Sequence, residues 1–237
     1  KVLNITTTNN AQQPNRFVFG TSHFNPLTQS PDGHIYYPSS YFTATKVNPE
    51  NFHTVSFKPL DVPEFGTYAW SYFVDSDKHL WAGYDNGKIA LFGTSESQWS
   101  QLTEDDALNF YTYQFIEKNK LFWLVTGAGL FVFDPKTFKT KNRYWAGGTG
   151  KFKLPFDDLR HAYLESDSTT FWLGTAGEGL IRFDTQTGDY QQFTKADGLS
   201  NNVINAVYGD DYNNLWLTSD YGIMRFNKTT YQVTSYL

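Results

Sequence analysis

The sequence contains no cysteine among its 237 residues. A disulfide framework is therefore excluded, and so are metal sites and nucleophiles that depend on thiols. The missing cysteine does not decide the compartment. The chain also has no apolar stretch of the roughly 20 residues needed to cross a bilayer. No charged and then apolar signal segment opens it.

The chain also lacks a strong excess of either positive or negative residues. The chain carries 19 basic and 24 acidic residues, and its net charge of −5 is scattered along the sequence. Because no basic run offers a surface for phosphates, we expect no nucleic-acid partner. The mildly acidic balance disfavours binding to anionic membranes. The 3.6-residue periodicity of helices is almost absent, which indicates an all-β protein.

Aromatic residues, by contrast, make up 19% of the chain. Five of them recur in near-copies of one short apolar segment: Tyr36, Trp81, Trp123, Trp172 and Trp216. The steps between successive anchors are 45, 42, 49 and 44 residues. A period in this range is typical of a repeat architecture, so each anchor marks one structural repeat.

The last repeat indicates what one unit contains. Segments 203–208, 215–218, 223–226 and 231–236 are rich in β-branched and aromatic residues, which predicts strands. Turns rich in Asp, Asn and Gly separate them, and these residues suit tight reversals of the chain. Four short antiparallel strands in about 40 residues make one blade of a β-propeller.

The shared internal spacing predicts an all-β propeller with about five four-stranded antiparallel blades. We expect one domain over residues 1–237, with blades at approximately 15–60, 61–103, 104–146, 147–198 and 199–237. An extra strand at 2–7 completes another blade, since an unpaired edge strand would be an aggregation hazard. Two arrangements remain open: a small closed ring, or a segment of a larger propeller cut from a longer protein.

The repeated tryptophans are predicted to be structural. Burying one aromatic ring removes roughly 150–250 Å² from water, and wedge-shaped gaps between blades need large flat side chains. A ligand contacts one place rather than several symmetric ones. We therefore predict that Trp81, Trp123, Trp172 and Trp216 all lie in the core.

Residues that break the repeat are the candidates for ligand binding. Trp70, Trp99 and Trp145 have no counterparts in other repeats, and a sugar ring can stack on such a side chain while its hydroxyls bond to polar neighbours. Other candidates lie near the start of the first strand of a repeat, or in the turn between its second and third strands. Both places lie on the face where propellers usually bind ligands. For each, the alternative is a solvated loop residue or a satisfied core group. The predicted ligand-binding set is Trp70, Tyr84, Asp85, Trp145, Arg160, His161, Asp220 and Tyr221.

The last repeat reads Asp197–Val203, then Asp210–Thr218, then Tyr221–Asn227. This pattern resembles the two-component regulator propeller repeat. The fourth repeat matches it through Phe171–Thr175 and Gly179–Asp184, the third matches in its third strand, and the first two are degenerate. The resemblance covers most of the chain and is most specific in its last third.

The resemblance implies a non-catalytic sensor module outside the cytoplasm. Such propellers precede a small β-sandwich, one transmembrane helix and a cytoplasmic output domain, often a histidine kinase. The resemblance also implies a homodimer in the full-length protein, and oligosaccharides are ligands of several members. Contact with the membrane would come only through segments absent from this chain. The repeat marks no ligand residues, so no site is carried over from it.

Two other functions stay open at the level of sequence. A propeller-type glycoside hydrolase or lyase would need paired carboxylates about 5–10 Å apart, which scattered loop acids neither establish nor exclude. A protein-interaction scaffold is compatible with the same sequence. We expect no cofactor and no metal, because the five histidines lack ligand spacing.

Overall fold

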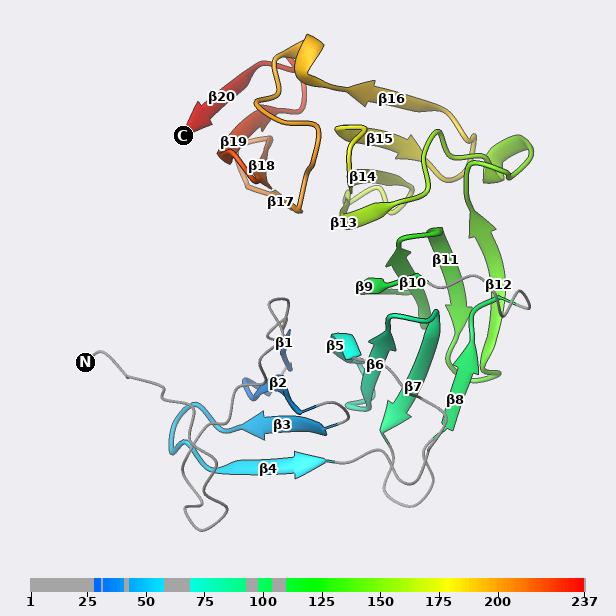
Figure 1. Cartoon of the computed structure of the whole chain (residues 1–237), viewed down its shortest axis with the longest axis vertical. Coiled ribbons are helices and arrows are strands. Elements are labelled where there is room, and N and C mark those ends of the chain that lie inside the picture. The colour runs from blue at the N-terminus through cyan, green and yellow to red at the C-terminus, as the bar shows by residue number, and fades with distance from the viewer. Residues whose placement is uncertain are drawn as a thin grey trace. The chain divides into compact units, whose positions relative to one another are not determined.

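The computed structural model describes residues 28–30, 32–40, 43–57, 69–92, 98–103 and 110–236. In these residues the strands fall into five four-stranded antiparallel sheets, which follow one another along the chain (Figure 1). Helical structure in the same residues consists of two 3₁₀ turns, η1 (Gly150–Phe152) and η2 (Lys195–Asp197). The predicted class, an all-β propeller with four-stranded antiparallel blades, is confirmed.

The first sheet contains β1 (Thr28–Gln29), β2 (Ile35–Ser40), β3 (Thr43–Val47) and β4 (Thr54–Phe57). The second contains β5 (Ala69–Val74), β6 (Leu80–Tyr84), β7 (Lys88–Phe92) and β8 (Gln98–Gln101). The third contains β9 (Thr112–Lys118), β10 (Leu121–Thr126), β11 (Gly129–Asp134) and β12 (Lys139–Tyr144).

The fourth sheet contains β13 (Leu159–Leu164), β14 (Thr170–Thr175), β15 (Leu180–Asp184) and β16 (Tyr190–Phe193). The fifth contains β17 (Ala206–Gly209), β18 (Asn214–Ser219), β19 (Gly222–Asn227) and β20 (Val233–Tyr236). Each sheet lies within one of the five ranges expected for blades. The expected strand at 2–7 lies outside the described residues.

The chain divides into two compact units, residues 1–117 and 118–237. In the first unit, buried residues of neighbouring sheets form one cluster that includes Tyr36, Tyr72 and Leu80. In the second unit, a cluster around Trp172, Phe193 and Phe226 joins the fourth sheet to the fifth. Apolar burial between adjacent sheets is thus the main stabilising contribution within each unit.

All five anchors lie in the second strand of their sheets, as the spacing predicts. The indoles of Trp81 and Trp172 make the same polar contact. Trp81 Nε1 donates to Asp75 Oδ2 at 2.9 Å, and Trp172 Nε1 donates to Glu165 Oε1 at 2.8 Å. The acid comes from the turn before the second strand in both sheets. This contact satisfies the one polar group of a buried indole, so these carboxylates have a structural role.

The prediction that all four repeat tryptophans lie in the core is wrong for Trp216. Trp81 and Trp172 are each 1% exposed and Trp123 is also buried, whereas Trp216 is 36% exposed. Trp216 keeps the polar contact, with Nε1 donating to Asp210 Oδ2 at 3.0 Å. Its ring stacks on Tyr236 of its own sheet, with centroids 5.9 Å apart. Burial of an anchor requires a following sheet, and the second unit places none over Trp216.

The predicted start of the first strand in the fifth sheet is also wrong. The sequence predicts a strand from 203, but β17 begins at Ala206. Val203 instead forms an isolated bridge with Ala176, and the Ile204 N–H donates to Thr175 O at 2.9 Å. These β-branched residues tie the linker to the preceding sheet. In the described residues no helix has the length and hydrophobicity of a membrane span.

Candidate functional site

The turn between the second and third strands contacts the following linker in three sheets. A turn glycine donates its N–H to a linker carbonyl each time: Gly87 to Phe110 at 2.9 Å, Gly129 to Asp157 at 2.8 Å and Gly179 to Asn202 at 2.8 Å. At Gly179 φ is +79° and an added Cβ would lie 2.0 Å from Phe193 O, so only glycine fits. Turns and linkers therefore share one end of each of these sheets.

The predicted ligand residues all lie at this end of their own sheets. Tyr84 and Asp85 follow β6, and Asp220 and Tyr221 form the turn after β18. Trp145 directly follows β12. Trp70, Arg160 and His161 lie near the starts of β5 and β13, whose first residues pair with the last residues of the second strands.

Trp70 and Arg160 occupy the same repeat position. Pairing shifts between Ala69 and Ser71 in β5, and between Leu159 and His161 in β13, so Trp70 and Arg160 are the bulged residues. A bulge re-aims the side chain at that point of the strand. The indole and the guanidinium therefore leave their strands in corresponding ways, a likeness that the sequence spacing alone does not reveal.

The residues that follow these bulges link neighbouring first strands. Ser71 Oγ donates to Thr112 O at 2.6 Å within the first unit. His161 Nδ1 accepts a hydrogen bond from the Val207 N–H at 3.3 Å within the second. Burial lowers the pKa of His161 to about 4. His161 is therefore neutral at pH 7 and joins β13 to β17, with its ring 4.9 Å from that of Tyr208.

Trp70 belongs to an aromatic cluster in the first unit. Its ring lies 4.2 Å from that of Tyr111 and 6.2 Å from that of Tyr113, measured between centroids. Nearby Tyr84 is fully buried, and burial raises the pKa of its hydroxyl. Rings in such close contact stabilise one another, so this cluster is packed against itself.

The other predicted residues in the second unit have separate surroundings. Arg160 Nη2 lies 3.4 Å from Asp158 Oδ2, and burial is the main cause that raises the pKa of Asp158. Asp220 Oδ1 accepts a hydrogen bond from Asn205 Nδ2 at 2.8 Å. Tyr221 is 67% exposed. The described pocket that Trp145 lines includes none of these residues.

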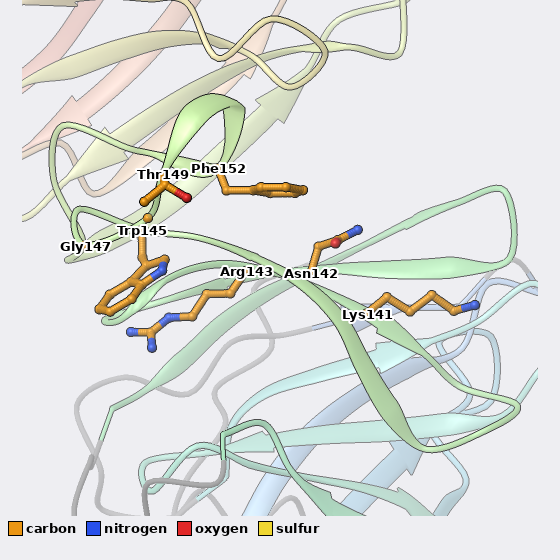
Figure 2. Close-up of a pocket in the computed structure, with 8 residues that line it drawn as sticks. Lys141, Asn142, Arg143, Trp145, Gly147, Thr149 and Phe152 are labelled. Atoms are coloured by element: carbon orange, nitrogen blue, oxygen red, sulfur yellow. The ribbon is translucent and has the colours of Figure 1, made fainter.

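Trp145 is the predicted residue that lines a described groove. The groove has a volume of about 420 Å³, and its lining residues are Lys141, Asn142, Arg143, Trp145, Gly147, Gly148, Thr149 and Phe152. Figure 2 shows Arg143 alongside the indole of Trp145, and Asn142 on the side where Thr149 and Phe152 lie. The groove combines an exposed aromatic ring with amide, hydroxyl and cationic groups.

Arg143 is held in place by three contacts. Its guanidinium carbon lies 4.3 Å from the ring centroid of Trp145 and 5.1 Å from that of Phe131. Its Nε donates to Ala128 O in the turn before β11, at 3.0 Å. Cation–π contacts and a directed hydrogen bond fix the plane of the guanidinium. Arg143 and Trp145 therefore form one preorganised pair.

The loop that completes the groove is closed by its own backbone. The Trp145 N–H donates to Phe152 O at 3.0 Å, and the Gly148 N–H donates to Trp145 O at 2.9 Å. An added Cβ at Gly148 would lie 2.2 Å from Phe152 O, so a side chain there is excluded. Asp157 Oδ1 accepts the N–H of Ala146. The loop is thus rigidly connected to the linker that leads into β13.

Sequence reasoning identified Trp145 but missed Lys141, Asn142, Arg143, Thr149 and Phe152. A signal for them exists in the anchor spacing. The step from Trp123 to Trp172 is 49 residues, the longest of the four. Part of the excess falls in the linker 145–158 after β12, which forms this loop.

A second pocket, of about 280 Å³, lies among the turns of the fourth and fifth sheets. Lys228 Nζ is 2.8 Å from Glu165 Oε1, the same oxygen that accepts from Trp172. Burial would raise the pKa of nearby Asp167, but hydrogen bonds from Thr170 and Thr169 outweigh it and lower the pKa to about 2. The Lys228–Glu165 ion pair joins the two sheets, whereas the Asp167 contacts stabilise a turn of the fourth sheet. Among the described residues, no group of three His, Cys, Asp or Glu is placed to hold a metal.

Comparison with known families gives a match in the last repeat. The family model named two component regulator propeller matches residues 198–221, which cover the linker, β17, β18 and the turn after it. This segment is therefore similar to a two-component regulator propeller repeat. The resemblance stated from the sequence is thereby confirmed in the segment where it was most specific.

A curated relative of the repeat-bearing chain is histidine kinase P4 of Formosa agariphila. It is 27% identical over 167 residues, which are 64% of this chain and 10% of the relative. The chain therefore spans about a tenth of the length of the relative it matches.

Two solved structures are also similar to this propeller chain. The extracellular domain of a hybrid two component system from B. thetaiotaomicron is 19% identical, with 89% of this chain and 35% of that chain covered and a TM-score of 0.41. A chain of the mitotic checkpoint complex is 13% identical, with 98% and 73% covered and a TM-score of 0.66. The second likeness shows the fold alone.

Proposed function

We propose that this chain is the non-catalytic, ligand-sensing input region of a bacterial two-component or related membrane signalling protein, located outside the cytoplasm. The repeat that matches the two component regulator propeller supports this role. The match to a histidine kinase supports the same role, and this match covers 10% of that protein's length. The kinase activity and the membrane anchor belong to parts of the protein other than these sheets.

The ligand is an oligosaccharide, and it binds in the groove beside Trp145. The observation that carries this assignment is an indole 37% exposed in a groove that also presents Asn142 and Thr149. Sugar rings stack their apolar faces on aromatic side chains, while their hydroxyls need amide and hydroxyl partners. Trp145 does not belong to the repeated core positions, so packing of the sheets does not account for its exposure.

Hydrolysis is not part of the proposal. None of the described residues that line the groove is acidic, and glycoside hydrolysis usually requires two carboxyl groups. The carboxylates of Asp75 and Glu165 are engaged with buried indoles instead. A panel of chromogenic glycosides is expected to show no turnover, and turnover at any site would overturn the non-catalytic assignment.

Signal transfer follows from how the groove loop is anchored. Asp157 accepts the Ala146 N–H from the loop, and its carbonyl accepts the N–H groups of Gly129 and Leu159. A ligand that favours one loop conformation therefore biases the position at which β13 begins. Binding shifts the population of sheet packings by the difference in its affinity for them.

The test is glycan binding by the whole chain and by Trp145→Ala. Loss of one stacking ring is expected to weaken binding about tenfold, which corresponds to about 1.4 kcal/mol. Isothermal titration with the glycans that bind the wild-type chain measures this change. Trp99→Ala is the matched control, since Trp99 is also non-repeat and 42% exposed but lies outside the groove. Equal affinities for the two variants would contradict the assignment.

A further inference from the structure

We infer that the groove beside Trp145 selects saccharides that carry an anionic substituent, a carboxylate or a sulfate ester. This inference rests on the proposed function, because it takes the groove as a saccharide site. It adds the chemical class of the ligand, which neither the repeat nor the relatives specify.

The charge of the groove lining is opposite to that of the chain. Lys141 and Arg143 line it, and none of the described lining residues is acidic. Lys151 adds a third cation at the same loop, with its Nζ 5.4 Å from the ring centroid of Phe152. The chain as a whole carries −5. Such a local reversal of sign raises the concentration of an anionic ligand near the groove.

Arg143 has the form of an anion-recognition residue. Its guanidinium plane is set by Phe131 and Trp145 and by donation to the Ala128 carbonyl, as described above. A planar guanidinium held in one orientation matches the paired oxygens of a carboxylate or sulfate. Because these contacts exist before any ligand binds, little side-chain freedom is lost on binding.

Lys141 reaches the groove because of a bulge in β12. Phe133 pairs with Thr140 and Val132 pairs with Asn142, so Lys141 is the extra residue. Lys141 and Asn142 thus face a single partner residue, and both line the groove.

Lys141 is available to a ligand despite an ion pair. Its Nζ lies 3.1 Å from Asp134 Oδ2, and its side chain is half exposed. The Asp134 side chain is 12% exposed, but the lysine end of the pair is open to water, which screens the attraction. An incoming anion can therefore compete with Asp134 for Lys141 or bind beside it.

The indole of Trp145 supplies the place for the sugar ring itself. An added Cβ at Gly147 would lie 2.6 Å from the six-membered ring of Trp145. The Gly147 backbone therefore lies close against that part of the indole, and the exposed remainder of the ring is the surface that a sugar can reach. Arg143 lies over one face of the ring, 4.3 Å from its centroid, so a sugar that packs on the exposed part of the indole places its substituents near the guanidinium.

The experiment compares matched charged and neutral probes with the whole chain. Galacturonate hexamers are paired with their methyl esters, and sulfated galactan oligosaccharides with their desulfated forms, so that the two arms separate carboxylate from sulfate. Isothermal titration is expected to give at least about tenfold tighter binding of the charged member in one arm or both. Raising the salt concentration is expected to weaken that member selectively.

Variants then assign the preference to the groove. Lys141→Gln and Arg143→Gln are expected to reduce the charged-to-neutral ratio severalfold, whereas Trp145→Ala weakens both members of a pair. Lys139→Gln is the matched control, because it removes the same charge from the same strand outside the groove lining. Melting temperatures show whether each variant folds. If Arg143→Gln does not fold, Lys141→Gln still tests the inference.

The outcomes separate the two proposals. Equal affinity for charged and neutral members, or a preference that Lys141→Gln and Arg143→Gln leave unchanged, overturns the inference but leaves saccharide sensing intact. Failure of all four probes to bind overturns the saccharide assignment of the groove and the inference with it.

Discussion

The fourth and fifth sheets contain the same repeat and differ in how far it is buried. Trp172 and Trp216 occupy the same strand position and make the same indole-to-carboxylate contact. Yet Trp172 is 1% exposed and Trp216 is 36% exposed. The ring of Trp172 packs against Phe226 of the next sheet at 5.5 Å. The repeat therefore determines strand position and polar contacts, and the neighbouring sheet determines burial.

The difference extends to the first strand of each sheet but not to the third and fourth strands, whose residues in line with the anchor are exposed in both sheets. Each anchor lies in a row of paired residues that runs across its sheet. The row in the fourth sheet is Tyr163, Trp172, Arg182 and Gln191, and the row in the fifth is Tyr208, Trp216, Arg225 and Thr234. Tyr208 is largely exposed, whereas Tyr163 packs against the core of the second unit. Two faces with related sequences thus have different environments.

The largest expected effect comes from truncating the two anchors. Trp172→Ala is expected to lower the free energy of unfolding by about 3–5 kcal/mol, because it leaves a cavity between two sheets. Trp216→Ala is expected to cost less than half of that, since part of its ring is already in water. Urea denaturation of both variants measures the difference. Equal losses would mean that the face of Trp216 is covered in solution.

The next effect tests the junction between the two sheets through His161. Burial lowers the pKa of His161 to about 4, against about 6.5 in an unfolded chain. Between these pH values the unfolded chain binds more protons, so the free energy of unfolding falls as the pH decreases. The expected loss from pH 6.5 to pH 4 is roughly 2–3 kcal/mol.

Denaturation midpoints measured across this range test the role of His161. His161→Gln should remove most of the slope, because glutamine can still accept from Val207 N–H and does not titrate. His79→Gln is the control, since the His79 ring is more than half exposed and lies in the first unit. An unchanged slope in His161→Gln would refute the role of this residue.

The smallest effect concerns the carboxylates that hold the indoles. Glu165→Gln is expected to lower the free energy of unfolding by about 1–2 kcal/mol, because Glu165 also pairs with the largely buried Lys228. Asp210→Asn should have a smaller effect, since Asp210 is only partly buried and none of the described cations forms an ion pair with it. Thermal denaturation of the pair measures this ranking. A reversed order would show that the exposed contact is the stronger one.

The anchors explain why much of the fold was predictable from sequence. Tryptophans that recur every 42–49 residues locate the second strands, and turn residues locate the reversals. Burial of Trp216 was not predictable, because it depends on a neighbour and not on the residue's own repeat. Val203 was assigned to a strand for its β-branched side chain, but the preceding sheet competes for its backbone.

The candidate groove was predictable only in part. Trp145 was identifiable because it breaks the repeat. Arg143 was not, because its position depends on stacking between Phe131 and Trp145, and that contact requires the loop to fold back on itself. Lys141 faces the groove through a bulge that alternation does not predict. Deviations in repeat length are therefore as informative as the repeats.

Asp157 has a consequence for how motion spreads through the second unit. Its side chain accepts from Ala146, and its carbonyl accepts from Gly129 and Leu159. Three backbone amides from the loop, the third sheet and the fourth sheet thus share a single acceptor residue. Local opening at any one of them loosens the other two, so their deuterium uptake rates should rise and fall together.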